Sequence, residues 1–245
     1  MSEIRKKYVL KLIGRSIIFI LCALACIFRP DSLSILNGLN FFRGWSVYHL
    51  LWFIWVVDML HQILPIRNKL PLGSMKLFEH RFKPILEKIN YQALRDYTIA
   101  TTKAAYKVFI VWIALILAIG CLYYGGVIGK LGLFMCSVCF YVCDLICVLV
   151  WCPFRLMMGN RCCTTCRIFN WDHLMMFSPL LFYPSVYCWS LLGLSVAAWL
   201  VWEIFIFLHP ERFWEGANAA LTCASCTDKL CTQYCRKLRP KKNEK

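Results

Sequence analysis

The stretch that decides the fold is VFIVWIALILAIGCLYY (residues 108–124), GGVIGK (residues 125–130) and LGLFMCSVCFYVCDLICVLVW (residues 131–151). Each of the two apolar runs approaches the ~20 residues that a helix needs to cross a bilayer. The glycine-rich connection between them carries only Lys130 as a charge, so it predicts a tight turn. We therefore expect a hairpin of two membrane-spanning helices.

The composition of the whole chain is that of a membrane protein. Hydrophobic residues make up 60% of the 245 residues and charged residues only 17%, whereas soluble proteins are about 45 to 50% apolar. This composition excludes a water-soluble globular protein. Further apolar runs predict spans at 13–28, at 45–64 and at about 187–208. The sequence thus predicts an all-α, polytopic membrane helix bundle over residues 1–208, surrounded by the lipid bilayer.

The apolar block Leu174–Leu208 is too long for one crossing, because a helix of this length would extend about 52 Å. Pro179 and Pro184 interrupt its first half. A single crossing would give five membrane segments. A short, proline-broken fifth segment followed by a sixth full span is the interpretation we favour. Broken backbone at membrane depth is tolerated where it is buried in protein or lines a cavity, so this segment is also a candidate cavity wall.

The distribution of charge predicts the topology. Lys and Arg total 28 against 13 Asp and Glu, a net charge of +15. The basic residues concentrate at the N-terminus, in the loop 66–107, in the segment 152–171 and in the tail 209–245. The positive-inside rule places these regions in the cytoplasm if the chain has six membrane segments. Within the loop 66–107, apolar residues recur near helical spacing and predict an amphipathic helix. These residues are Leu77, Phe82, Ile85, Leu86 and Ile89. Such a helix would either lie on the lipid headgroups of the inner leaflet or expose its polar face to solvent without contacting the membrane.

Two groups of cysteines lie outside the apolar spans and are the candidate metal ligands. They are Cys152, Cys162, Cys163 and Cys166, then Cys223, Cys226, Cys231 and Cys235. A Cys-x-x-Cys step lets two sulfurs face one metal, and a second pair completes a thiolate shell for zinc or an iron–sulfur cluster. The gaps of two, four and three residues in the tail favour a 4Fe–4S cluster, with zinc as the alternative. Reduced structural thiols or a redox disulfide remain further alternatives.

The residues Cys147, Trp151, Cys152, Pro153 and Phe154 carry a short resemblance. This pattern at a span end resembles the Cys-Pro motif of membrane polyferredoxin subunits of quinol-linked reductases, over about ten residues. The resemblance implies cluster ligation and electron transfer, but this tail has a longer second gap and has Arg236 where that family has proline. The string RCCTTCRIFNWDHLMMF (residues 161–177) also resembles part of a group of bacterial cysteine-rich multi-pass proteins, from which no activity follows.

Polar residues inside the apolar spans are functional candidates, because a charge in hydrocarbon needs a partner or a wet cavity. The candidate proton relay comprises Asp58, His61, Asp144 and His173. We expect Asp58 and His61 to share a helical face, Asp172 to cap the following helix, and Arg15 to extend to the inner headgroups. Four cysteines with helical spacing lie on one face of the expected span 131–151, namely Cys136, Cys139, Cys143 and Cys147. This stripe predicts a face that packs closely against a neighbouring helix. The alternative is a path for electrons or metal ions.

These features favour a membrane electron-transfer protein whose cytoplasmic clusters exchange electrons with quinone and with a redox partner protein. The alternatives are a zinc-stabilised membrane scaffold or assembly protein and a thiol–disulfide carrier using Cys163 with Cys166 or Cys223 with Cys226. No nucleotide-binding loop and no common hydrolase motif is present, so whether the chain is itself an enzyme stays open. The basic residues are explained by topology and accompany no nucleic-acid-binding module, so we expect no nucleic-acid partner.

Overall fold

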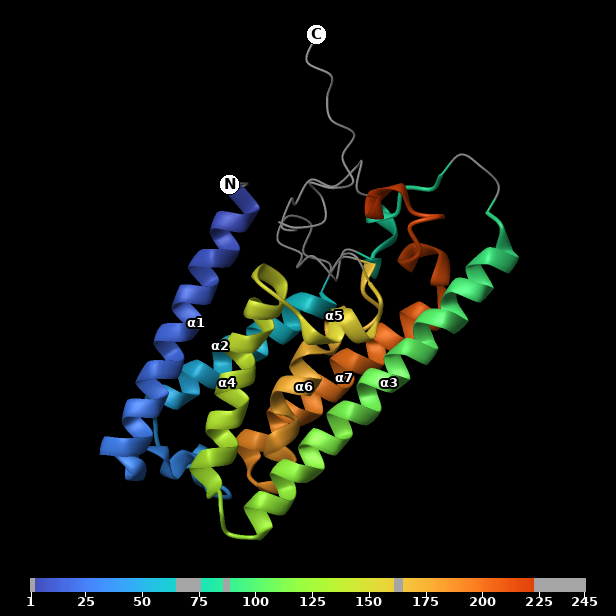
Figure 1. The fold of residues 1–245 in the computed structure, drawn as a ribbon. Helices are drawn as coiled ribbons and strands as arrows, with labels where there is room; N and C mark the ends of the chain where they lie inside the picture. The colour runs from blue at the N-terminus through green and yellow to red at the C-terminus, as the bar shows by residue number, and fades with distance from the viewer. Residues whose placement is uncertain (1–2, 65–75, 86–88, 161–164, 223–245) are drawn as a thin grey trace.

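The computed structural model describes residues 3–64, 76–85, 89–160 and 165–222, and this part of the chain is helical without strands. Its long helices are α1 (Glu3–Phe28), α2 (Val47–Ile63), α3 (Tyr91–Tyr124), α4 (Lys130–Leu149) and α7 (Val186–Leu208) (Figure 1). All of these except the shorter α2 are long and apolar enough to cross a membrane. The prediction of a helical, multi-pass membrane protein is therefore confirmed at this level.

Side-chain caps explain where several of these helices begin. Ser46 accepts a hydrogen bond from Tyr48 N at the start of α2, and Ser185 accepts one from Cys188 N at the start of α7. Asn90 accepts from Gln92 N and Ala93 N, so α3 begins at Tyr91 rather than near residue 108. The basic stretch before the expected span is consequently part of a single 34-residue helix, about 51 Å long.

The bundle is held together by two helix pairs and a buried central segment. Helix α1 packs along α4, and α2 packs along α7. Large side chains from different helices meet without exposed surface, and they include Trp55, Phe134, Phe177, Tyr187 and Trp202. The Trp55 and Phe177 rings, for example, meet edge to face with centroids 5.2 Å apart. Such contacts join α2 to the segment that precedes α7.

That segment is the proline-broken region expected from Pro179 and Pro184. It consists of η6 (Phe169–Trp171), α6 (Asp172–Phe177) and η7 (Ser178–Phe182). It begins where Trp171 Nε1 donates to Glu203 near the end of α7, and it ends where Val186 N donates to Gly38 O. Phe177 and Leu180 are fully buried, so the segment runs inside the bundle alongside most of α7. The break in the helix is as the two prolines predict.

Helix α3 approaches this segment closely because residue 120 is glycine. A Cβ atom at Gly120 would lie 2.5 Å from the Phe182 ring, which is closer than real contacts permit. Trp112 Nε1 on the same helix donates to Ser178 Oγ at 3.1 Å. The long helix α3 is therefore fixed against η7 at two points. One is the close approach of Gly120 to the Phe182 ring, and the other is the hydrogen bond from Trp112 to Ser178.

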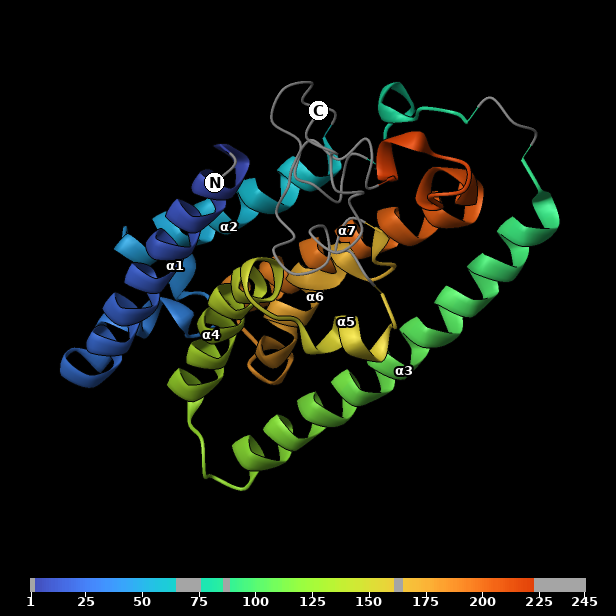
Figure 2. The same ribbon diagram turned by 45° about the horizontal axis from the view of Figure 1, so that its top comes forward.

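One end of the bundle gathers segments that are distant in the sequence. The start of α1, the end of α2, the start of α3 and the ends of α4 and α7 all lie at the top of Figure 1, and Figure 2 shows the same grouping. After α7, the chain folds through η8 (Pro210–Phe213) and η9 (Ala219–Leu221) onto residues 76–85. Arg212 Nη1 donates to Leu77 O at 3.1 Å, and Ala219 N donates to Lys83 O at 2.8 Å.

These contacts replace the amphipathic helix that the apolar spacing of the loop predicts. Residues 76–85 contain only the short turn η4 (Glu79–Arg81) and extended chain, so the prediction is wrong for this part of the loop. Pro84 lacks an N–H group and restricts Lys83 to extended backbone. The carbonyl of Lys83 and the N–H of Ile85 bond instead to residues 217–219. Residues 66–75 and Leu86 are not among those described.

Candidate functional site

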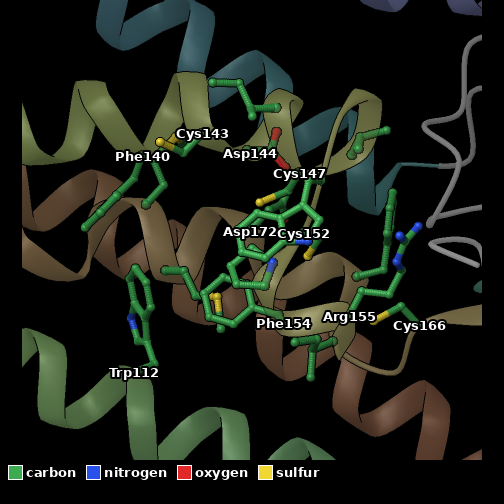
Figure 3. A pocket seen from close by; sticks show the side chains of 18 of the residues that line it. Trp112, Phe140, Cys143, Asp144, Cys147, Cys152, Phe154, Arg155, Cys166 and Asp172 are labelled. Atoms are coloured by element: carbon green, nitrogen blue, oxygen red, sulfur yellow. The ribbon is translucent and has the colours of Figure 1, made fainter. Parts of the chain in front are cut away.

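A cavity of about 420 Å³ lies between α3, α4, α6 and the short helix α5 (Pro153–Met157) (Figure 3). Its wall is aromatic, because the Trp112 ring meets Phe140 at 5.1 Å and Phe154 at 5.9 Å between centroids. The polar side chains around it are mainly thiols and carboxylates, namely Cys143, Cys147, Cys152, Cys166, Asp144 and Asp172. An apolar cavity of this size with a few convergent polar groups is typical of a small-molecule site.

Cys152 reaches the cavity because the chain turns sharply after α4. Val150 N and Trp151 N both donate to Ile146 O, at 2.8 and 3.1 Å, and this turn brings Cys152 back onto Cys147. The hydrogen bond from the Cys147 thiol lowers the pKa of Cys152 to about 7, helped by backbone N–H groups and opposed by burial. Cys152 therefore ionises more readily than an ordinary thiol, and the thiolate is the form that binds metals and reacts.

Cys166 lies in a more enclosed setting on the same cavity. Its side chain is buried, and burial raises the pKa of this thiol, against the opposing effects of the Ile168 N–H, Asn160 and Lys76. Asn160 Nδ2 also donates to Thr165 O at 3.4 Å and so joins the two sides of the loop 160–165. The pKa values of the two described thiols of the first cysteine group are thus shifted in opposite directions, although both thiols face one cavity.

Cys166 also borders the start of the C-terminal segment. A second, small cavity is lined by Cys166 and Arg167 together with Pro210 and Phe213. The Phe213 ring packs edge to face on Trp202, whose Nε1 donates to Arg167 O at 3.1 Å. The segment that leads to the tail cysteines is therefore fixed beside the loop that carries the first group.

An ion pair holds this loop on α7. Arg167 Nη1 and Nη2 donate to the two carboxylate oxygens of Glu203 at 2.8 and 2.6 Å, and Trp171 Nε1 donates to the same carboxylate at 2.9 Å. Bidentate pairs of this kind fix geometry as well as charge. Sequence reasoning missed Glu203, although it is the only acidic residue in the apolar block Leu174–Leu208.

Most of the predicted metal ligands lie outside the described residues. Cys152 and Cys166 are described, whereas Cys162, Cys163, Cys223, Cys226, Cys231 and Cys235 are not. Within the described ranges, no three His, Cys, Asp or Glu side chains are close enough to hold a metal ion. A four-thiolate centre that included Cys152 or Cys166 would therefore take at least two of its ligands from those six cysteines.

A network of charged side chains lies next to the cavity, between α1, α2 and α4. Arg15 Nη1 donates to Asp144 at 2.6 Å and to Tyr141 O at 2.8 Å, and Arg15 Nη2 lies 3.7 Å from Asp58. The expectation that Arg15 extends to the headgroups is wrong, because its side chain is only 11% exposed. Its guanidinium instead lies 3.9 Å above the Tyr141 ring and balances the buried carboxylates.

A second part of the network is built on Asp172, the first residue of α6. Gln62 Nε2 donates to both Asp172 oxygens, at 2.9 and 3.2 Å, and His173 Nδ1 lies 3.2 Å from the same carboxylate. The prediction that Asp172 caps the helix is wrong, because Trp171 occupies the cap position and the Asp172 side chain turns to α2. His173 is 4% exposed and interacts electrostatically with Asp144 and Asp58.

The structure brings three of the four predicted proton-relay residues together. Asp58, Asp144 and His173 belong to one network, to which Arg15, Gln62 and Asp172 are additions. No hydrogen bond or ion pair joins His61 to Asp58 among the described residues, since Asp58 faces Arg15. The sequence does contain a signal for the Arg15–Asp144 pair. Arg15 is the only basic residue within the first apolar run, 13–28, so it needs an acidic partner such as Asp144 inside the bundle.

The cysteine stripe on α4 does not form the packed seam that its spacing predicts. The packed face of this helix carries Leu133, Phe134, Ser137, Val138, Tyr141, Leu145 and Leu149. Cys139 and Cys143 are exposed, and Cys143 and Cys147 line the cavity. Large side chains on another face of the helix fill the space between helices better than thiols do, so the stripe lies off the packed face.

No protein-family model matches this chain, and neither curated proteins nor solved structures gave a significant match. The function must therefore be inferred from the chain's own residues and their arrangement.

Proposed function

We propose that this protein is a membrane-bound electron-transfer protein that holds one or two iron–sulfur clusters at the cytoplasmic face and exchanges electrons with quinone and a redox partner protein. A 4Fe–4S cluster is the form that the cysteine spacing favours. The cluster supplies one-electron storage when bound. The protein's own residues supply thiolate ligands, an apolar path to the membrane and groups that carry protons.

The observation that carries the proposal is the position of the two cysteine-bearing segments. Cys166 and Phe213 border the same small cavity, and residues 217–219 are hydrogen-bonded to residues 83–85. Residue 222, which directly precedes Cys223, thus belongs to a segment anchored at the end of the bundle that carries Cys152 and Cys166. Thiols from both groups can therefore share one centre or form two neighbouring ones.

The proposed topology has six membrane segments. They are α1, α2, α3, α4, the broken segment 169–182 and α7, whose final residues return the tail to the side of the N-terminus. The loop 66–107 and the tail 209–245 carry most of the basic residues, and both leave the bundle at this end. The positive-inside rule makes this end cytoplasmic. The fifth segment is buried in protein, as broken backbone at membrane depth must be.

The charged network beside the cavity is suited to proton exchange with a quinone, which takes up two protons when it is reduced by two electrons. Three carboxylates, those of Asp58, Asp144 and Asp172, face one arginine and one histidine. The His173 ring is buried, and its Nδ1 lies 3.2 Å from the Asp172 carboxylate. A buried imidazole beside carboxylates can accept or release a proton without a large change in geometry.

Anaerobic purification with metal analysis tests the proposal. We expect a brown protein that contains iron and acid-labile sulfide, with broad absorption that is bleached by dithionite. A colourless protein with stoichiometric zinc would contradict the proposal and support a zinc-stabilised scaffold. A metal-free protein with reversible disulfides would contradict it as well.

Three serine variants locate the centre. We expect Cys166→Ser and Cys226→Ser each to remove the iron chromophore. The matched control is Cys139→Ser, since Cys139 is exposed on α4 and lies apart from both groups. Retention of full iron content in the Cys166 and Cys226 variants would remove these residues from the ligand set.

A further inference from the structure

The structure places two thiols on one cavity that the electron-transfer proposal does not use as a pair. Cys147 lies in the last turn of α4, and Cys152 lies three residues beyond the end of that helix. The two side chains are close enough to interact with one another. Both are partly exposed, and both line the aromatic cavity (Figure 3).

We propose that Cys147 and Cys152 are a redox-active dithiol that closes to a disulfide by reducing a quinone bound in the adjoining cavity. This assignment goes beyond the cluster proposal and concerns a different reaction of the same end of the bundle. It gives Cys152 a different partner from the metal that the sequence predicts, because among the described residues Cys152 interacts with a thiol of the membrane helix.

The end of α4 separates Cys147 from Cys152, whereas the neighbouring pair lies wholly within the helix. Cys139 and Cys143 are close enough to interact, but they are four residues apart within regular helix. Such residues hold their Cβ atoms about 5 to 6 Å apart, and a disulfide needs about 3.5 to 4.5 Å. Cys152 follows the turn at Val150 and Trp151, so its backbone can adjust without breaking the helix.

The cavity beside the pair fits a quinone by its walls and by its opening. The rings of Trp112, Phe140 and Phe154 form an aromatic wall against which a flat ring can pack. Leu115 and Ile146 also line the cavity and are 42% and 38% exposed, on helices that are long and apolar enough to cross the membrane. A lipid-soluble acceptor can therefore enter from the hydrocarbon phase, where a water-soluble disulfide cannot.

The reaction balances as a two-electron transfer. The S–H bonds of Cys147 and Cys152 break and one S–S bond forms. Two electrons and two protons pass to the two carbonyl oxygens of the quinone, which leaves as hydroquinone. Asp144 and Asp172 line the same cavity and are the groups within it that can relay these protons.

The test uses the full-length protein, reduced, freed of reductant and reconstituted in lipid nanodiscs. A fully ring-substituted benzoquinone is added, because it has no free ring carbon to which a thiol could add. We expect a peptide linked through Cys147 and Cys152 by mass spectrometry, and hydroquinone formation that falls by one equivalent per chain in Cys147→Ser and in Cys152→Ser. The matched control Cys143→Ser, one turn away on the same cavity, should lose none.

Metal content is measured on the same samples, so that the two proposals fail separately. Loss of iron in Cys166→Ser with an unchanged Cys147–Cys152 link would leave the dithiol standing and affect only the cluster. Linkage of Cys152 to another cysteine, or an unchanged hydroquinone yield in Cys147→Ser, would overturn the dithiol. Loss of metal in Cys152→Ser together with no link in the unmodified protein would show that Cys152 is a metal ligand instead.

Discussion

The Arg15–Asp144 and Arg167–Glu203 pairs have the same shortest nitrogen–oxygen distance, 2.6 Å, but they have different roles in this molecule. Arg167 and Glu203 meet through both nitrogens and both oxygens, and Trp171 adds a third donor to the carboxylate. Arg15 donates to Asp144 through one nitrogen and also faces Asp58. The Arg167–Glu203 pair is bidentate and holds a loop in place, whereas Arg15 is an arginine shared between acids.

The difference shows how charge is managed in the two regions. At the cysteine-bearing end, one cation meets one anion through two parallel hydrogen bonds. Inside the bundle, Asp58, Asp144 and Asp172 lie near one arginine and one histidine, so the network can change its proton content. A one-to-one bidentate pair fixes structure, and a network with more carboxylates than arginines is suited to moving protons.

Breaking the inner pair should have the largest effect. Arg15→Met leaves the partly buried Asp144 and Asp58 carboxylates without their cation, and the cost of about 3 to 5 kcal/mol for removing one partner from a fully buried pair is the upper bound. We expect a large fall in the thermal unfolding midpoint in detergent. The double variant Arg15→Met with Asp144→Asn should recover part of the loss, and equal instability of the two proteins would contradict the electrostatic explanation.

Breaking the outer pair should cost less stability but affect the thiols. Glu203→Gln removes one charge and one strong acceptor from Arg167, an effect of roughly 1.5 to 3 kcal/mol for hydrogen bonds to charged groups. Because Arg167 adjoins Cys166, we also expect faster alkylation of Cys166 by a maleimide. Unchanged alkylation would show that the pair does not hold the loop.

The two described thiols of the loop sharpen the comparison through their pH dependence. Thiolate is the reactive form, so alkylation accelerates as pH rises through the pKa. In metal-free protein, the rate for Cys152 should reach half its maximum near pH 7, the value that its hydrogen bond from Cys147 sets. Burial raises the pKa of Cys166, so this residue should react only at more alkaline pH. Coincident profiles would contradict this ordering.

An exposed pair supplies the smallest expected effect. His209 Nδ1 lies 3.2 Å from Glu211 after the end of α7, where the side chains are 39% and 27% exposed. Solvent-exposed pairs contribute under about 1 kcal/mol. Glu211→Gln should therefore leave the unfolding midpoint within a degree or two of that of the unmodified protein. A fall comparable to that of Glu203→Gln would mean that exposure does not separate the two pairs.

The sequence predicted the helices well where a single physical requirement decides them. A run of about 20 apolar residues has few alternatives to a membrane helix, and Pro179 and Pro184 cannot continue one, so both the spans and the broken segment followed directly. Spacing was a weaker guide where partners decide. The residues around Leu77 and Phe82 have helical periodicity, yet hydrogen bonds from the C-terminal segment hold that loop extended.

The sequence by itself determined that this is a helical membrane protein with cysteine-rich segments outside its apolar spans, because composition and run length do not depend on neighbours. Only the tertiary structure decided that Arg15 faces Asp58 as well as Asp144, that the cysteines of α4 lie off its packed face, and that Cys152 lies close to Cys147. Each of these depends on which side chains from distant helices fill the space between them, and periodicity along one helix carries no information about the helix opposite.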